Sequence, residues 1–475
     1  MNSYETVIGL EVHTQLKTES KIFCSCPTTF DSPPNTNICP VCCGYPGVLP
    51  VFNQKALELA IRVSLALNCQ INPNVYFERK NYFYPDLPKN FQISQYKMPL
   101  GHSGYLKLAS GKTIRINRVH LEEDAGKLIH REDCSLIDFN RTGTPLLEIV
   151  SEPEINSPEE AFDYLRYLKL TLIYIQASDC DMERGSLRCD ANISLRKKGD
   201  KILGTKVELK NMNTFKGVKA ALEHEVRRQA KVLQSSGTIS QETRLWDAGS
   251  SKTVVMRTKE QAHDYRYFPE PDLLDVAVPG AIICSEKTKI KELPLEKEER
   301  FKKNYGIVDK ELEVFISNVW LADFLEEALK FYHQSRELVN WVLGPFLEQV
   351  NLLKLDPPQV KISAESFAKI VKYFSEGKMN NLAAKKILSL TIATNDDIDE
   401  VIRKEKLIQV SDENGLIAFV DEAIKENPKA ISEYLEGKHQ AIQFLVGQVM
   451  RKSKGKANPK VARDMLEKNI KEAGR

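Results

Sequence analysis

Four cysteines near the start of the chain have the spacing of a structural zinc site. Cys24 and Cys26 form a C-x-C pair, Cys39 and Cys42 form a C-x-x-C pair, and twelve residues lie between the two pairs. Two such pairs in a proline-rich loop are typical of four thiolates around one tetrahedral zinc ion. We therefore expect these cysteines to bind zinc, with Cys43 as a competing ligand; the alternative is free buried thiols. Because protein side chains would fill every position, the metal is expected to be structural.

A second group of side chains indicates a divalent cation. Glu11 and His13 are two positions apart in an alternating segment, so both project from one face of a strand. Glu148 lies in the apolar run LLEIV, where a carboxylate is costly to bury without a cationic partner. A cation shared with Glu122 or Glu123 of the segment HLEEDAGK would supply that partner. The alternative is that Glu148 pairs with an arginine such as Arg141 and that Glu122, Glu123 and Asp124 are solvated.

Basic and amide side chains on two further alternating segments have the chemistry to face phosphate or carboxylate groups. In the first, apolar residues alternate with Arg188, Asp190 and Asn192, and the second ends in Lys210 and Asn211. Cross-strand ion pairs on a solvated sheet face are the alternative, and the residue types alone do not decide between the two.

No standard nucleotide motif accompanies these side chains. The triplet Gly111-Lys112-Thr113 resembles the end of a P-loop, but Leu106 stands where that motif requires its first glycine. The dinucleotide glycine fingerprint and the HExxH and GxSxG motifs are also absent from the sequence. A nucleotide bound here would need a less common binding motif.

Alternating apolar and polar residues predict that strands position these side chains. Residues 8–15, 187–196 and 206–210 all alternate, as in an antiparallel sheet with one buried and one polar face. The segment SPEE supplies a serine cap and a first-turn proline, which predicts a helix over about 158–175. A second helix is expected over about 218–233.

The apolar period becomes helical from about residue 295. Helices are expected over 310–331, 335–350, 363–374 and 379–389. We therefore predict an α+β fold in three parts. These are an N-terminal antiparallel-sheet cradle with the zinc-stapled loop (1–294), an all-helical domain (295–395) and a small helical tail domain (396–475).

Length and charge exclude several classes of protein. The chain has 475 residues, no apolar run approaches the ~18 residues of a membrane helix, and its net charge is only +2. The last 25 residues are different, since nine Lys or Arg against three acidic residues give +6. This end is suited to phosphate contacts, with a solvated lysine-rich tail as the alternative. No targeting segment is visible, so we expect a cytoplasmic protein without membrane contact.

Several motifs taken together are more specific. The segments VIGLEVHTQL, RKNYFYPDLPKNFQISQY, HLEEDAGK, NRTGTPLLEIVSEP, KNMNTF, DYRYFPEPDL and FLVGQVMRKSKGKANP follow one another along the chain. In this order they resemble the B subunits of the bacterial tRNA-dependent amidotransferases, and the resemblance covers essentially the whole chain. It implies an ATP-dependent carbon–nitrogen ligase that corrects misacylated Glu-tRNA(Gln), Asp-tRNA(Asn) or both. The sequence leaves open which of these tRNAs is the substrate.

The resemblance also implies partners and a division of labour. An amidase-like A subunit would release ammonia from glutamine, and a small C subunit would complete the heterotrimer. The B subunit would phosphorylate the carboxylate of the attached amino acid and let ammonia displace the phosphate. A zinc-stapled RNA-binding protein without chemistry is the first rival interpretation. An archaeal relative of the family is the second, but it typically carries an inserted domain for which this chain has no room.

Site residues follow from the matching motifs. The resemblance assigns magnesium to Glu11, His13, Glu123 and Glu148, although strand parity alone equally allows Glu122. The expected contacts to ATP and the bound substrate are Lys80, Tyr82, Arg188, Asp190, Asn192, Lys210 and Asn211. The expected tRNA contacts in the tail are Arg451, Lys452, Lys454 and Lys456.

Overall fold

The computed structural model describes most of the chain, in two compact units. The described residues are 3–258, 265–394, 396–405, 413–436, 438–453, 457 and 459–473. The first unit runs from Met1 to Lys297 and the second from Glu298 to Arg475.

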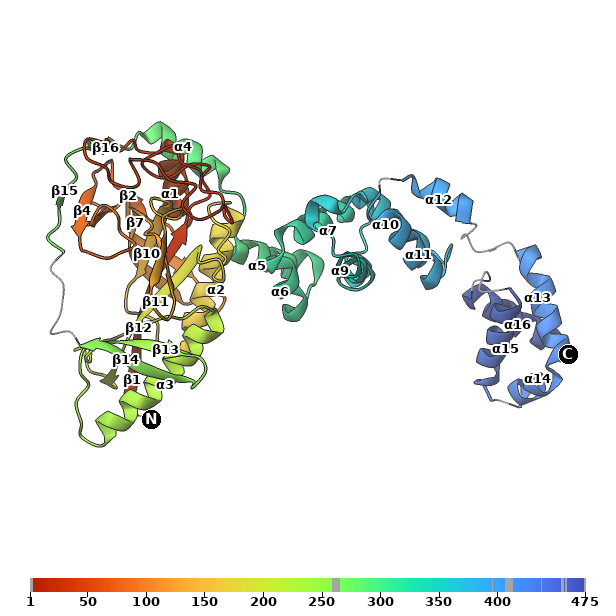
Figure 1. The fold of residues 1–475 in the computed structure, drawn as a ribbon. Coiled ribbons are helices and arrows are strands. Elements are labelled where there is room, and N and C mark those ends of the chain that lie inside the picture. The colour runs from red at the N-terminus through yellow and green to blue at the C-terminus, as the bar shows by residue number, and fades with distance from the viewer. Residues whose placement is uncertain are drawn as a thin grey trace. The chain divides into compact units, whose positions relative to one another are not determined.

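A nine-stranded sheet forms the centre of the first unit (Figure 1). Its strands, in spatial order, are β14 (Lys252–Thr258), β13 (Glu242–Asp247), β12 (Val207–Lys210), β11 (Leu187–Lys197), β1 (Tyr4–Gln15), β10 (Pro145–Ser151), β7 (Thr113–Glu123), β6 (Gly101–Lys107) and β2 (Gln70–Ile71). All neighbouring strands are antiparallel except β12 and β13, which are parallel. The predicted α+β class and mainly antiparallel sheet are therefore confirmed, with one parallel pair added.

Short strands extend the unit at its edges. A three-stranded sheet contains β15 (Phe268–Pro269), β4 (Glu78–Asn81) and β5 (Phe91–Ser94). Two further pairs are β16 (Val276–Ala277) with β3 (Asn74–Val75), and β8 (Lys127–His130) with β9 (Ser135–Asp138).

Alternation along the central strands separates an apolar face from a polar face. In β1, Ile8, Leu10 and Val12 are buried, whereas Glu11 and His13 are half-buried on the opposite face. The helices α1 (Gln54–Ala66), α2 (Pro158–Tyr174) and α3 (Phe215–Gln234) share one apolar core with the buried side chains of the sheet. Figure 1 shows α2 and α3 along the same side of the sheet. The other face of the central strands is left to polar side chains.

The start of α2 illustrates how local sequence fixes an element. The Ser157 side chain accepts a hydrogen bond from the backbone N–H of Glu160, and Pro158 occupies the first turn. Both features satisfy or remove backbone donors that a helix start leaves unpaired. The helix therefore begins where the sequence predicted it.

Helices make up the second unit in its described part. The last helix that lies wholly in the first unit is α4 (Gly280–Lys289), and α5 (Pro294–Tyr305) crosses the boundary between the units. It is followed by α6 (Asp309–Ser317), α7 (Val319–Phe331), α8 (Ser335–Trp341), a π-helical turn (Val342–Phe346), α9 (Leu347–Leu352), a 3₁₀ turn (Pro357–Gln359), α10 (Ala364–Ser375), α11 (Asn381–Thr391), α12 (Ile398–Glu405), α13 (Glu413–Glu426), α14 (Pro428–Leu435), α15 (Ala441–Lys452) and α16 (Pro459–Ala473). None of the helices in the described part of the chain has both the length and the apolar composition needed to cross a membrane.

Two of the expected long helices are interrupted. The helix expected over 310–331 is divided at Asn318, whose φ of −124° and ψ of 85° are not helical. The helix expected over 335–350 passes through the π-helical turn, which contains Pro345. Because proline has no N–H to donate, it removes one hydrogen bond of the regular helix.

The second unit contains two separate apolar cores. One includes side chains from Phe301 to Ile402, and the other includes side chains from Leu416 to Ile470. Ile398 and Ile402 of α12 pack into the first core. The tail was expected to begin at residue 396, but the packing assigns α12 to the preceding helices and only α13 onward to the tail.

Candidate active site

Backbone register brings polar side chains from four strands into one row. Glu148 of β10 lies opposite His13 of β1 and opposite His120 of β7. Arg188 of β11 lies opposite His13 on its other side. Side chains directly opposite one another in neighbouring strands project from the same face of a sheet. The row therefore joins segments that are far apart in the sequence.

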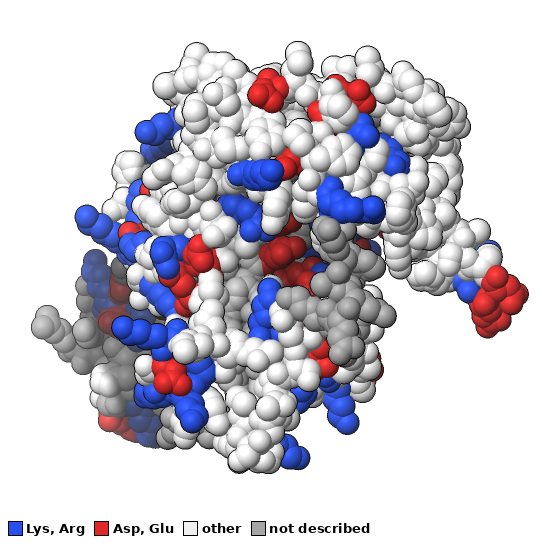
Figure 2. All heavy atoms as spheres, turned by 90° about the vertical axis from the view of Figure 1, so that its left-hand side faces the viewer, with Lys and Arg blue, Asp and Glu red and all other residues white. Residues whose placement is uncertain are grey.

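A second row runs beside the first. Asp190 of β11 lies opposite Glu11 of β1, and Lys210 of β12 forms an ion pair with Asp190. The Nζ atom of Lys210 is also 3.1 Å from Oε1 of Glu208. Cross-strand ion pairs, the alternative raised from the sequence, are thus present here. On the side of the unit away from α2 and α3, acidic side chains gather in a hollow surrounded by basic ones (Figure 2).

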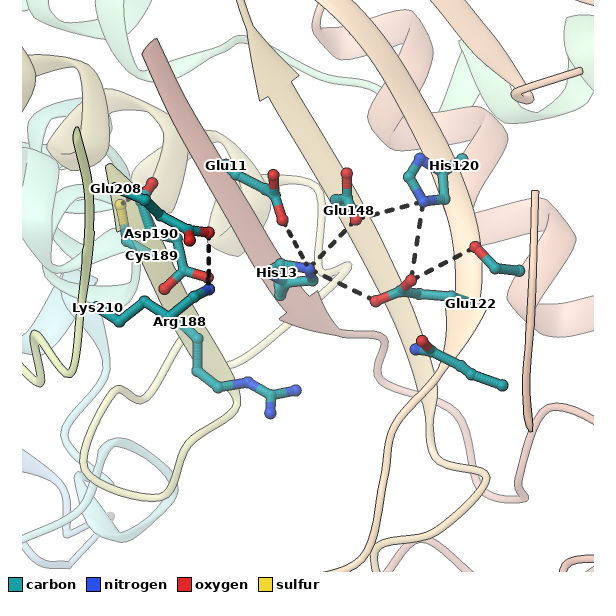
Figure 3. Close-up of polar contacts among 12 residues, drawn as sticks. Glu11, His13, His120, Glu122, Glu148, Arg188, Cys189, Asp190, Glu208 and Lys210 are labelled. Carbon is teal, nitrogen blue, oxygen red and sulfur yellow. Dashed lines mark hydrogen bonds and ion pairs between the residues drawn. The ribbon is translucent and has the colours of Figure 1, made fainter. Parts of the chain in front are cut away.

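Carboxylates surround the His13 imidazole (Figure 3). Its Nε2 atom lies 3.7 Å from Oε1 of Glu11, 3.5 Å from Oε1 of Glu122 and 3.3 Å from Oε2 of Glu148. A second imidazole, His120, has its Nε2 atom 3.4 Å from Oε2 of Glu148 and 3.8 Å from Oε2 of Glu122. These five side chains, which we call the carboxylate–histidine cluster, come from β1, β7 and β10.

Burial and charge oppose each other in this cluster. Burial disfavours the imidazolium of His120, but the nearby Glu148 and Glu122 carboxylates outweigh it and raise the pKa of His120 to about 9. Burial likewise disfavours the charged form of His13, and the same carboxylates nevertheless raise its pKa. Burial would raise the pKa of Glu148, but the charges of His120 and His13 and their hydrogen bonds lower it. Burial, followed by the Glu148 charge, raises the pKa of Glu11. The carboxylates therefore depend on positive charge, which a divalent cation would also supply.

The structure brings Glu122, and not the expected Glu123, into the cluster. Glu123 receives hydrogen bonds from Lys89 Nζ, 2.6 Å from its Oε2 atom, and from the backbone N–H of Ile93, 2.9 Å from its Oε1 atom. Consecutive residues of a strand point to opposite faces, so Glu122 and Glu123 cannot both face His13. The resemblance had assigned the cation to Glu123, whose carboxylate is already paired with Lys89.

His120 is the cluster residue that the sequence analysis missed. It lies two positions before Glu122 on β7 and therefore shares its face. The same parity that grouped Glu11 with His13 groups His120 with Glu122, so the signal was present in the segment HLEE. Arg118 extends this side of β7, with Nη2 3.1 Å from Oε1 of Glu148.

Arg188 lies at the edge of the cluster and is held by a buried carboxylate. Its Nη2 atom is 2.8 Å from Oδ1 of Asp124. The Asp124 charge raises the pKa of Arg188 and outweighs the opposite effect of burial. Asp124 also accepts a hydrogen bond of 2.8 Å from the Gln15 side chain. The guanidinium is thus fixed in place beside the row of carboxylates.

The other expected substrate contacts have different surroundings. Lys80 Nζ lies 5.0 Å from the ring centre of Tyr265 and 5.9 Å from that of Tyr82. Burial would lower the pKa of Lys80, but the nearby Glu122 charge and others raise it. Asn211 donates a 3.2 Å hydrogen bond to the backbone carbonyl of Trp246, which supports the fold.

A cavity opens beside the cluster. It has a volume of about 280 Å³, and both Glu11 and Asn192 line it. Ser151, Lys206 and Leu203 lie on its other walls. The expected contact Asn192 therefore faces a space next to one of the cluster carboxylates.

The four cysteines of the loop converge. The sulfur atoms of Cys24, Cys26, Cys39 and Cys42 all lie within 4.8 Å of one another. A hydrogen bond with Cys24 is the main cause that lowers the pKa of Cys42 to about 4, against the effect of burial. The same hydrogen bond raises the pKa of Cys24, and burial raises that of Cys26 to about 11. It is the convergence of the four sulfurs that fits a tetrahedral zinc ion, which binds cysteines as thiolates. Cys43 is not in this group among the described residues.

The basic residues of the tail are described only in part. Arg451 and Lys452 end α15. Lys452 Nζ is 2.8 Å from Oε2 of Glu426 and 3.2 Å from Oε2 of Glu422, so its charge is partly compensated within the tail. Lys454 and Lys456 lie outside the described residues.

Known families and proteins match nearly the whole chain. The family described as the GatB/GatE catalytic domain matches residues 6–284, and the family described as the GatB domain matches residues 323–470. Three similar proteins are each named as the B subunit of an aspartyl/glutamyl-tRNA(Asn/Gln) amidotransferase. The protein from Carboxydothermus hydrogenoformans is 46% identical over 474 residues, which cover 98% of each chain. That from Moorella thermoacetica is 46% identical over 98% of this chain and 100% of its own. That from Caldanaerobacter subterraneus is 47% identical over 98% and 99%.

Proposed function

The chain belongs to the family of aspartyl/glutamyl-tRNA(Asn/Gln) amidotransferase B subunits, and we propose that its polar sheet face uses ATP to activate the carboxylate of a mischarged aminoacyl-tRNA. The substrate is Glu-tRNA(Gln), Asp-tRNA(Asn) or both. The chain works in the cytoplasm within a heterotrimer, beside an amidase-like A subunit and a small C subunit.

The proposed reaction has two group transfers. A carboxylate oxygen of the tRNA-bound amino acid attacks the γ-phosphorus of ATP, the new P–O bond forms and the bond to ADP breaks. Ammonia, released from glutamine by the A subunit, then attacks the acyl carbon. Phosphate leaves with the electron pair of the C–O bond, and the nitrogen loses a proton as the amide forms. The first transfer is needed because oxide is a poor leaving group, whereas phosphate is a good one.

The observation that carries this proposal is the carboxylate–histidine cluster. Glu11, Glu122 and Glu148 each present an oxygen within 3.7 Å of His13 Nε2. Oxygen ligands are those that magnesium prefers, so these carboxylates would hold the cation and His13 would complete the set or contact substrate. Bound magnesium would neutralise charge on the phosphates during transfer. A surface that only binds tRNA phosphates gains nothing from half-buried and buried carboxylates.

The neighbouring side chains have distinct tasks in this proposal. The cavity lined by Glu11 and Asn192 receives the nucleoside of ATP. Arg188 of β11, the strand beside β1, and Lys210 of β12, the next strand, orient the phosphates and stabilise their charge. Lys80 lies on the other side of the cluster, where its ammonium group is attracted by the Glu122 and Glu148 carboxylates. There it positions the substrate carboxylate.

Groups outside the cluster bind the tRNA and support the fold. Tyr82 offers a ring on which the terminal adenosine stacks. The basic end of the chain, including Arg451, Lys452, Lys454 and Lys456, contacts tRNA phosphates without reading bases. The zinc ion in the cysteine loop has a structural role, since four thiolates leave no position for substrate.

A burst experiment tests the proposal. The reconstituted complex is mixed with mischarged Glu-tRNA(Gln), ATP and magnesium, without any source of ammonia. We expect one rapid turnover that forms ADP and an acyl phosphate. In Glu148→Gln the burst rate should fall about 100-fold or more, because a charged group of the transfer site is lost.

Glu152→Gln is the matched control. Glu152 follows β10 directly and accepts a 2.7 Å hydrogen bond from Asn117, outside the cluster. Its variant should keep the burst. An equal burst in the wild type and in Glu148→Gln would overturn the assignment of the kinase reaction to this face.

A further inference from the structure

Lys21 is a buried cation beside the cysteine loop. None of its surface is exposed to solvent (0%). Its Nζ atom donates one hydrogen bond of 3.5 Å to Sγ of Cys42 and another of 3.4 Å to the backbone carbonyl of Phe139. A lysine is almost never completely buried unless a group of opposite charge accompanies it. The surroundings of Lys21 must therefore supply negative charge.

A carboxylate does not supply that charge. In the part of the chain that the structure describes, Lys21 forms no ion pair with Asp or Glu. Lys89 offers a contrast, because it lines the same cavity as Lys21 but is paired with Glu123. Of the two groups that accept hydrogen bonds from Lys21, only the sulfur of Cys42 can carry a negative charge.

A zinc ion bound by four thiolates has the charge that Lys21 lacks. The two positive charges of zinc and the four negative charges of the thiolates leave a twofold negative charge on the complex. Two of the four cysteines, Cys26 and Cys42, are buried. Charge is costly to bury unless a nearby group of opposite charge compensates it. The buried ammonium and the buried side of the zinc complex therefore compensate each other.

The backbone places Lys21 at this position. Its own N–H donates a 2.9 Å hydrogen bond to the carbonyl of Cys26, and the next N–H, that of Ile22, donates one of 2.9 Å to the carbonyl of Gly143. A Cβ atom added at Gly143 would lie 3.5 Å from Cδ of Lys21 and 3.6 Å from Cβ of Cys42. The lysine stem and the zinc ligand thus pack around the same glycine, and the ammonium group is held beside the sulfur.

We propose that Lys21 is the counter-cation of the zinc site and a positioning residue for the Cys42 sulfur. Its charge compensates the zinc complex, and its hydrogen bond withdraws electron density from the sulfur, which becomes a weaker nucleophile. Loss of a group that contacts a metal ligand from outside typically lowers metal affinity about 10-fold to 100-fold. This role is independent of the proposed reaction, because it concerns the metal of the loop.

Zinc transfer to a chelator tests the proposal. The complete heterotrimer is mixed with a chromophoric chelator well below its melting temperature, and the zinc affinity is measured. Lys21→Met, which replaces the ammonium group by an uncharged one, should lower the affinity about 10-fold to 100-fold. Lys21→Arg keeps the charge and should restore most of the loss. Lys89→Met removes the neighbouring lysine and should hold zinc like the wild type.

Two outcomes of this measurement would overturn the proposal. In the first, Lys21→Met holds zinc as tightly as the wild type. In the second, Lys89→Met loses zinc affinity as much as Lys21→Met does, which would mean that any buried lysine near the loop has this effect.

Alkylation tests whether the effect is centred on one sulfur. Each complex is treated briefly with N-ethylmaleimide, and mass spectrometry gives the initial rate at each cysteine. In the wild type, Cys42 should react more slowly than Cys26, which is also buried. Lys21→Met should accelerate the reaction of Cys42 more than that of Cys26. The backbone N–H of Cys39, which also donates a hydrogen bond to the Cys42 sulfur, at 3.2 Å, is kept in this variant.

A lysine that only supported the fold would accelerate both reactions equally, and that result would overturn the proposal. If Lys21→Met does not fold, the wild-type order decides. A Cys42 that reacts as fast as Cys26 would then overturn the proposal, and a slower Cys42 would support it.

Discussion

The cysteine loop and the polar sheet face both gather metal-ligating side chains, but they hold them by different means. In the loop, Cys24 and Cys42 are joined by turns and have no strand of the central sheet between them. On the sheet, His13 and Glu148 are placed by the register of β1 and β10. The comparison teaches that a site on paired strands is positioned by the fold itself, whereas a site in an irregular loop depends on its metal.

Burial shows the same difference. The loop leaves large apolar side chains in solvent, with Tyr45 61%, Leu49 65% and Val51 73% exposed. The sheet face stands on a core in which Leu10 and Val12 are almost completely buried. A loop that cannot bury its own apolar residues needs another source of stability, and four metal–thiolate bonds at the converging cysteines would supply it.

The largest predicted effect is the loss of a zinc ligand from the loop. Cys39→Ser should release zinc and lower the free energy of unfolding by about 5 kcal/mol, because loss of a structural metal is among the most damaging changes. That corresponds to roughly 10 °C or more in melting temperature. Calorimetry and metal analysis of the purified complex measure both quantities.

The burst reaction supplies the control for this variant. Below its melting temperature, Cys39→Ser should keep the ADP burst per folded molecule, since the cluster is placed by strand pairing. Loss of the burst at unchanged stability and zinc content would break the comparison and give the zinc a role in the reaction.

The next prediction uses two neighbouring glutamates on β7 that face opposite ways. Glu122→Gln should lower the burst rate about tenfold to 100-fold with little change in stability, because it removes a charge from the cluster. Glu123→Gln should keep the burst but lower the free energy of unfolding by about 3 kcal/mol, because Lys89 is left buried without its partner. Burst kinetics and thermal unfolding of both variants provide the measurements. The reverse pattern would favour Glu123 as the magnesium ligand, as the resemblance implies.

Local sequence was enough to predict much of the first unit. Alternation predicted the buried Leu10 and Val12 and the polar Glu11 and His13, because the side-chain period of a strand is two. The cap at Ser157 predicted the start of α2, because an unpaired N–H at a helix start has few possible partners. These features depend only on residues near one another in the chain.

The missed features depend on distant residues or on single interruptions. Whether Glu122 or Glu123 faces His13 is decided by the pairing of β7 with β10, which the sequence of β7 alone does not contain. Strand parity already groups His120 with Glu122, but its position opposite Glu148 follows from this register and not from the local sequence. The interruption at Asn318 lies within an unbroken apolar period, so the pattern predicted one long helix.

The smallest predicted effect concerns the fifth cysteine of the loop. Cys43 directly follows Cys42, but its sulfur is not among the four that converge. Cys43→Ser should therefore retain zinc and change the free energy of unfolding by no more than about 0.5 kcal/mol, whereas Cys42→Ser should lose the metal. Metal analysis of the two variants side by side tests this. Zinc lost from Cys43→Ser but kept by Cys42→Ser would mean that the loop rearranges around its metal, and the contrast between a metal-dependent loop and a preformed sheet site would become sharper still.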